Sequence, residues 1–312
     1  MGERLQFGVM VPQLGSGDYA ASRTVAQQAE ALGFDSVWVA DHLFGIPSPQ
    51  DTLFLECWTL LTALAVETQR VRIGTMTLCN GFRPPALLAK MAATLDVISQ
   101  GRLEVGIGSG WYEREFLSYG YPFPKASVRA GQLDEALQIL KLMWSEPTTN
   151  FAGTHYQIVD APNDPKPLQQ PGPPIHIGGD GEKVMLPLVA RHADWWSYWL
   201  AATADGFRYK LGVLERCCKE AGRDFVSLKK SLIGGILLVE SEKEIPLIMA
   251  TLEKKGLHFG ARIGIIGTAD MVCKRIEEYR QLGTSLFIIA PVFTDWQTFL
   301  PLFKEKVIAQ VC

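Results

Sequence analysis

The amino-acid sequence predicts a closed α/β barrel of about eight parallel strands with insertions, the (β/α)8 or TIM-barrel class. Short apolar runs alternate with longer amphipathic segments, as expected when each buried strand is followed by a covering helix. Polar and glycine-rich residues follow several different strands, whereas an open doubly wound sheet gathers its site at one switch point. No low-complexity linker divides the 312 residues. We therefore expect a single barrel domain over residues 1–312.

The expected strands are short apolar runs. The first lies near the amino terminus, where it is too short for a signal-peptide core and lacks a small-residue cleavage site. Three of the strands follow a glycine at which a helix ends, namely Gly33, Gly101 and Gly283. The expected strands are residues 5–11, 36–40, 71–77, 102–108, 175–178, 193–198, 231–239 and 285–291.

One segment, about residues 147–174, interrupts this alternation. It contains a short strand-like pair around residues 151–159 and then a proline-rich run. Because prolines disfavour helix interiors and central strands, we expect an insertion over the barrel surface or mouth. A structural connector and a lid both remain open.

The composition is that of an ordinary soluble globular protein, with 47% hydrophobic and 20% charged residues and a net charge of −3. The sequence has no block of basic residues, so nucleic-acid binding is not expected. No apolar run approaches the roughly 20 residues that span a membrane. The six cysteines include no C-x-x-C pair and are interpreted as reduced thiols. We expect a cytoplasmic protein and, because barrels often pair through exposed helices, a homodimer.

Asp41 and His42 directly follow the second expected strand. Histidine is the side chain best able to move a proton near neutral pH, and a neighbouring carboxylate fixes its tautomer or raises its pKa. Neighbouring strand residues point to opposite faces, so the two side chains need not touch. Because catalytic groups of barrels sit at strand ends, both are candidate catalytic residues.

The next two strands end in features that suit the approach of a flat ring. The third strand ends in small and polar residues. These either hold a distorted backbone against a ligand or simply follow an ordinary buried strand. The fourth leads into Gly106-Ile107-Gly108-Ser109-Gly110, where the backbone is largely free of side chains. This spacing matches the dinucleotide fingerprint only loosely.

Trp111 follows this turn as either a stacking platform or part of the core. Glu113 and Glu115 come next, and we expect both to face solvent on a short helix. Together with Phe44 and Tyr112, Trp111 suggests an aromatic-walled pocket.

A second glycine turn, Gly178-Gly179-Asp180-Gly181, precedes an expected helix over residues 182–192. Free backbone amides at a helix start bind phosphate, which the paired glycines favour here. The alternative is an ordinary cap in which Asp180 accepts from those amides. A comparable segment, Ile266–Asp270, is explained by a threonine cap at the start of another helix.

In their order and spacing, these features resemble the bacterial luciferase-like oxidoreductases, in particular the branch that uses the deazaflavin coenzyme F420. The resemblance covers nearly the whole chain. Besides the opening strand, it rests on residues 39–42, 72–75, 101–103, 108–116, 171–179 and 266–268.

The resemblance implies a barrel in which the cofactor ring lies at the carboxyl ends of the strands, backed by a non-proline cis peptide near Met76-Thr77. It implies a phosphate or tail contact from Gly178 and Gly179. Some sugar-phosphate dehydrogenases of the family have a glutamate acid where this chain has Trp111, which argues against that substrate. The expected cofactor-binding residues are Asp41, Met76, Thr77, Cys79, Gly108, Ser109, Gly110, Trp111, Gly178, Gly179 and Asp180.

The function that the resemblance implies is hydride transfer between F420 and a small organic substrate, with His42 handling the proton and Asp41 setting its state or holding the ring. The main alternative is an FMN-dependent monooxygenase supplied by a partner flavin reductase. A metal-dependent barrel hydrolase would use Asp41, His42 and His176, but the first strand lacks a His-x-His pair, His176 is more typical of a core, and we expect no metal. A flavin-binding protein without a reaction is a further class.

Overall fold

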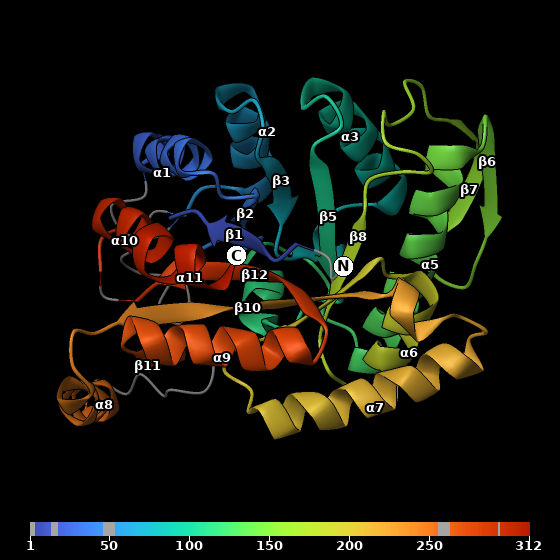
Figure 1. The fold of residues 1–312 in the computed structure, drawn as a ribbon. Coiled ribbons are helices and arrows are strands. Elements are labelled where there is room, and N and C mark those ends of the chain that lie inside the picture. Colours follow the sequence, from blue (N-terminus) through green and yellow to red (C-terminus); the bar gives the residue numbers. More distant parts are fainter. Residues whose placement is uncertain (1–3, 14–17, 46–53, 255–262, 293) are drawn as a thin grey trace.

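A computed structural model describes residues 4–13, 18–45, 54–254, 263–292 and 294–312. Within these ranges, eight parallel strands close into a barrel that β12 completes by pairing with β1 (Figure 1). All eight predicted strands are confirmed, with ends that differ by a few residues. In barrel order they are β1 (Gln6–Met10), β2 (Ser36–Val39), β3 (Arg72–Thr75), β5 (Leu103–Gly108), β8 (Ile175–Gly178), β9 (Trp195–Trp199), β10 (Lys229–Leu238) and β12 (Thr284–Pro291).

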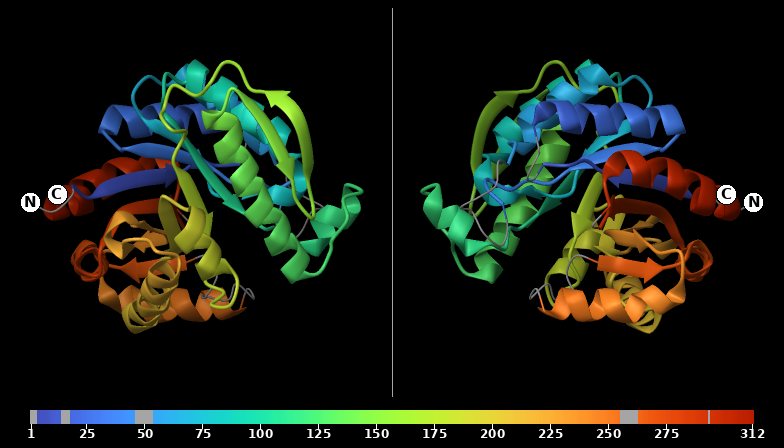
Figure 2. Two further views of the ribbon diagram at one scale, coloured as in Figure 1. Left: turned by 90° about the vertical axis from the view of Figure 1, so that its right-hand side faces the viewer. Right: turned by 90° about the vertical axis from the view of Figure 1, so that its left-hand side faces the viewer.

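The helices surround this barrel (Figures 1 and 2). The first helix ends as predicted, since Gly33 has a left-handed φ of 83° and its N–H bonds the carbonyls of Ala29 and Glu30. The helices are α1 (Tyr19–Leu32), α2 (Cys57–Glu67), α3 (Pro85–Ile98), α4 (Glu113–Ser118), α5 (Ala126–Ser145), α6 (Met185–His192), α7 (Ala204–Glu220), α8 (Ile245–Lys254), α9 (Ala269–Gln281), α10 (Trp296–Phe303) and α11 (Ala309–Val311).

The predicted insertion contains an antiparallel hairpin, β6 (Thr148–Ala152) and β7 (Gln157–Pro162), which packs beside α5 (Figure 2). Two further short strands extend the barrel sheet. β4 (Leu78–Cys79) pairs with β5, and β11 (Ile263–Gly267) pairs with the last part of β10. β11 was not among the predicted strands, although its last two residues belong to the segment Ile266–Asp270 that was expected to lead into the next helix. The predicted Thr268 cap of that helix is confirmed.

The barrel interior is filled by side chains, so the site must lie at its end. Trp38, Met76, Trp195, Leu286 and Ile288 form the interior cluster. Glycines on the neighbouring strands make room for the Trp38 indole, because a Cβ at Gly8 or Gly74 would lie within 2.5 Å of it.

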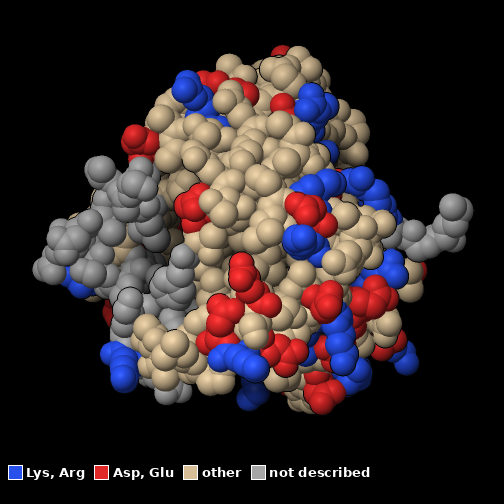
Figure 3. Space-filling model, turned by 60° about the vertical axis from the view of Figure 1, so that its left-hand side comes forward, with Lys and Arg blue, Asp and Glu red and all other residues tan. Residues whose placement is uncertain are grey.

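The distribution of surface charge and the state of the cysteines are those expected from the composition. On the face shown in Figure 3, basic and acidic side chains are interspersed and no extended basic surface is visible. All six cysteines are free. Among the described helices, none is both long and apolar enough to cross a bilayer.

Candidate functional site

The barrel brings the predicted strand-end residues together. The strands β2, β3, β5 and β8 are neighbours in the sheet and run parallel, so their carboxyl ends share one rim (Figure 1). Thr77 lies between two glycines of this rim: a Cβ at Gly108 would lie 3.3 Å from its hydroxyl oxygen, and one at Gly178 would lie 3.6 Å from its methyl carbon. We call Thr77, Gly108 and Gly178 the backbone cradle.

The peptide bond between Met76 and Thr77 is cis, as the resemblance implied. It lies between β3 and β4, and Met76 N–H donates to the Val39 carbonyl at 2.8 Å. Because no side chain at Gly108 or Gly178 covers the cradle, a planar ring can lie against its backbone. That a flat flavin or deazaflavin ring lies here, as the family resemblance implied, stays a prediction.

Asp41 is buried and held by two groups. Its carboxylate accepts a hydrogen bond from Cys79 N–H at 2.8 Å and a bidentate pair from Arg83 at 2.7 and 3.0 Å. Burial alone would lower the pKa of Arg83, but Asp41 raises it above the usual value. Arg83 also bonds Glu56, the residue that caps α2. Asp41 thus ties β2 to the β4 end.

His42 takes a different carboxylate. Its Nδ1 lies 3.0 Å from Oε2 of Glu115 on α4, and Glu115 also accepts from Leu43 N–H at 2.7 Å. The prediction that Glu115 faces solvent is wrong, since it is 2% exposed, whereas Glu113 is exposed as predicted. In the sequence, only the apolar neighbour Phe116, which is buried, indicates that the side of the helix carrying Glu115 faces inward. The adjacent Asp41 and His42 have separate partners, as strand alternation allows.

The rim beside His42 carries aromatic rings. Trp111 is 64% exposed, and its ring lies 6.2 Å from that of His42. Tyr112 packs against Trp111 at 5.2 Å and against Phe44 at 6.0 Å. Trp111 is therefore not part of the core.

Cys79 and Gly110 are packed on the inner side of this rim. A Cβ at Gly110, where φ is 78°, would lie 2.7 Å from the Cys79 sulfur. Burial raises the pKa of the Cys79 thiol to about 12, so it is a packing group rather than a nucleophile at neutral pH. The intervening Ser109 is half-buried.

The turn at Gly178-Gly179-Asp180 continues the rim beyond β8. Gly179 has a φ of 112°, and its carbonyl accepts from the Trp196 indole at 2.9 Å. The helix α6 begins at Met185 rather than at residue 182, and its N-cap is Val184. Asp180 therefore does not cap this helix, and the alternative interpretation of the turn as an ordinary cap is wrong.

A cation that the sequence analysis missed lies at this turn. Lys210 of α7 donates to the Asp180 carbonyl at 3.0 Å and to Glu182 at 2.8 Å, and Glu182 raises the pKa of Lys210. Nothing in the sequence distinguishes Lys210 from other lysines of an amphipathic helix. Because Glu182 pairs with Lys210, the charge of this lysine is already compensated at the turn.

His176 lies inside the barrel, as predicted for a core histidine. Its ring is fully buried, stacks on Trp195 and bonds Glu104 at 2.7 Å. Burial raises the pKa of Glu104, but the bonds from His176 and Arg72 outweigh it and lower that pKa. Across the described residues, no three His, Cys, Asp or Glu side chains cluster as metal ligands would. His176, the third ligand of the hydrolase alternative, thus lies inside the barrel rather than at the rim.

A backbone cradle and a histidine–carboxylate pair at the rim of a parallel barrel suit the binding of a planar redox cofactor. The chain belongs to the luciferase-like monooxygenase family, whose sequence profile matches residues 5–246. The predicted family and fold are confirmed.

Relatives of two cofactor classes are similar to the chain. An F420-dependent glucose-6-phosphate dehydrogenase of Microbacterium testaceum is 36% identical over 91% of this chain and 90% of its own length. A second such enzyme, from Amycolatopsis mediterranei, is 35% identical over 54% of this chain. An FMNH2-dependent dimethylsulfone monooxygenase of Pseudomonas putida is 28% identical over 63%. The chain spans 48% and 56% of the length of the last two relatives.

Among solved structures, an F420-dependent secondary alcohol dehydrogenase with an F420–acetone adduct superposes with a TM-score of 0.83. The match covers 99% of both chains at 23% identity, so it shows the shared fold. The relatives named here thus include both F420-dependent and FMN-dependent enzymes.

Proposed function

We propose that this protein is an oxidoreductase that transfers a hydride between coenzyme F420 and a small organic substrate. The observation that carries the proposal is the joint position of the backbone cradle and the His42–Glu115 pair at one rim. The F420-dependent relatives, one of which matches over most of the chain, support the choice of cofactor.

The cradle residues would hold the ring, with Met76, Ser109, Gly110 and Trp111 around it. When bound, F420 supplies the hydride chemistry. The phosphate-bearing tail is proposed to lie at Gly178, Gly179 and Asp180, as the family resemblance implies.

His42 is proposed to hold or move the proton at Nε2. Because a carboxylate only accepts hydrogen bonds, Glu115 favours the tautomer in which His42 Nδ1 carries a proton. This leaves the Nε2 position for the substrate. The proton-handling unit is then His42 with Glu115 as its positioning residue.

Asp41 has a different proposed role. Its oxygens are engaged by Arg83 and Cys79 N–H, so it fixes the end of β4 and with it the ring side of the cradle. That arrangement makes Asp41 an anchor for the cofactor platform.

The substrate is proposed to be an uncharged organic molecule rather than a sugar phosphate. By the family resemblance, Trp111 stands where some sugar-phosphate dehydrogenases have an acid, and the rim around it is aromatic. A screen of secondary alcohols and ketones against glucose 6-phosphate, followed by F420 absorbance, tests this choice. Turnover of glucose 6-phosphate alone would reject it.

The second candidate is an FMN-dependent monooxygenase with a partner flavin reductase, which the 28% identical FMNH2-dependent relative favours. Anaerobic assays separate the two functions, because a monooxygenase requires oxygen and a deazaflavin hydride transfer does not. Turnover that stops without oxygen would support the monooxygenase.

We also propose that a single barrel domain accounts for the chain and that it forms a homodimer in the cytoplasm. Exposed apolar side chains on adjacent helices support pairing, namely Val66 on α2 and Leu87 and Ile98 on α3. Light scattering of the purified protein tests the homodimer, and a monomeric mass would reject it.

A further inference from the structure

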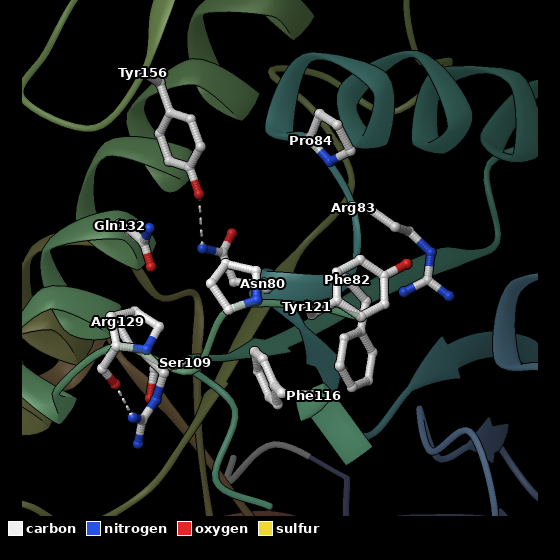
Figure 4. Close-up of a pocket in the computed structure, with 13 residues that line it drawn as sticks. Asn80, Phe82, Arg83, Pro84, Ser109, Phe116, Tyr121, Arg129, Gln132 and Tyr156 are labelled. Atoms are coloured by element: carbon white, nitrogen blue, oxygen red, sulfur yellow. Dashed lines mark hydrogen bonds between the residues drawn. The ribbon is translucent and has the colours of Figure 1, made fainter. Parts of the chain in front are cut away.

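We propose that a cavity beside the barrel rim, outside the cradle, binds an uncharged ring compound that carries an amide or hydroxyl group. The cavity has a volume of about 290 Å³ and lies between the starts of α3 and α5 and the turn of the β6–β7 hairpin (Figure 4). This volume is near the lower end, about 300 Å³, of sites for drug-sized ligands. Its lining does not include His42, Thr77 or Gly178, so it lies outside the cradle, and it adjoins the proposed cofactor site at Ser109.

One wall of the cavity is aromatic. Figure 4 shows Phe82, Phe116 and Tyr121 on the same side, and prolines complete this part of the lining. Phe82 and Phe116 pack at 4.9 Å and Phe82 and Tyr121 at 5.3 Å, so the wall is a continuous set of rings. Such a surface favours a ring-shaped ligand by apolar burial and ring packing.

The opposite side presents polar groups with unused hydrogen-bonding capacity. Asn80 is 4% exposed, and its Nδ2 donates to the Tyr156 hydroxyl at 3.2 Å, while its Oδ1 has no partner among the described residues. Because Tyr156 accepts this bond, its own proton is available to a ligand. The Gln132 amide also lines the cavity and makes no hydrogen bond within the described part of the chain.

The charged groups of the lining already have partners. Arg83 is paired with Asp41 and Glu56. Arg129 donates to the carbonyls of Gly110 and Pro124, and its guanidinium lies 3.9 Å from the Phe123 ring centroid. Since both cations are engaged, the cavity offers uncommitted amide and hydroxyl groups and no free charge. These groups match a neutral amide or hydroxyl rather than an anion.

Titration of the purified protein with benzamide, followed by NMR, tests the proposal. We expect saturable one-to-one binding in the presence and absence of F420. Gln132→Leu and Tyr156→Phe should each weaken it about three- to tenfold by removing one hydrogen bond. Gln138→Leu, on the same helix but outside the cavity, is the matched control and should leave binding unchanged.

Three results would overturn the proposal. The first is the absence of saturable benzamide binding to the folded wild-type protein. The second is binding that Gln132→Leu and Tyr156→Phe leave unchanged. The third is tighter binding of benzoate than of benzamide, which would assign the cavity to an anion. Each result is independent of whether F420 binds in the cradle.

Discussion

Nδ1 of His42 lies 3.0 Å from a carboxylate oxygen of Glu115, although 73 positions separate the two residues. The other oxygen of Glu115 bonds the backbone N–H of Leu43, so the carboxylate holds both the ring and the loop beside it. The loop after β5 thereby orients a histidine at the end of β2. The proposed proton transfer depends on this contact.

The first prediction concerns that contact. His42→Ala should lower kcat about 100-fold or more, as expected when a general acid or base is lost. Glu115→Gln should lower kcat roughly tenfold, about 1.4 kcal/mol of barrier, because the amide no longer enforces a proton on Nδ1. Steady-state assays with a substrate that reduces F420, together with ¹⁵N shifts of the His42 ring, measure both effects.

The double variant decides whether the two residues act as one unit. Combined with His42→Ala, the Glu115→Gln change should cause little further loss, because residues of one unit are non-additive. Glu113→Gln, on the exposed side of α4, is the matched control. Fully multiplicative losses, or an unchanged His42 tautomer in Glu115→Gln, would remove Glu115 from the proton-handling unit.

The second prediction concerns the buried pair of Asp41 and Arg83. Arg83→Met should destabilise the fold by about 3–5 kcal/mol, because it leaves the Asp41 carboxylate buried without its cation. Adding Asp41→Asn should recover part of that loss, since no uncompensated charge remains. Urea unfolding measures both values. A loss in Arg83→Met no larger than in Glu56→Gln would show that the pair is not needed.

The third prediction concerns the cradle. An alanine Cβ at Gly178 would make ordinary contacts, 3.6 Å from Thr77 and 3.9 Å from the Ser197 carbonyl, so Gly178→Ala should fold normally. It should nevertheless weaken F420 binding at least about tenfold, roughly 1.4 kcal/mol, because the methyl occupies the face proposed for the cofactor. Gly212→Ala, where no atom lies within 4 Å of the new Cβ, is the control. Unchanged F420 affinity in Gly178→Ala would place the cofactor elsewhere.

The fourth prediction concerns the pH dependence of stability. Glu104 has a lowered pKa in the folded protein through His176 and Arg72, so its ionised form stabilises the fold. That contribution is complete above the unfolded-state value of about 4.3 and is lost as pH falls through the lower folded pKa. The difference in unfolding free energy between wild type and Glu104→Gln should therefore be constant near neutral pH and shrink below about pH 4.3. A difference that grows on acidification would contradict the assignment.

The barrel was predictable because its strands are short apolar runs separated by amphipathic helices. The spacing of hydrophobic residues and the length of each run can be seen in a single sequence. β11 was not, because it is only five residues long and pairs only with the end of β10. The cis peptide at Met76-Thr77 followed from family resemblance and not from the residue pattern.

The candidate site was predictable in its strand-end residues but not in their partners. Which carboxylate meets His42 depends on how α4 turns over the rim, and a six-residue helix shows too little periodicity to reveal it. Arg83 and Lys210 were missed for the same reason, because each reaches the rim from a helix or loop whose rotation the sequence does not encode locally.

The most direct test of the proposed function is a parallel titration of the purified apo-protein with F420, FMN and FAD, followed by cofactor fluorescence and absorption. We expect selective binding of F420 that Gly178→Ala weakens. Selective binding of FMN, or no binding of F420 to the folded protein, would contradict the proposed F420-dependent hydride transfer.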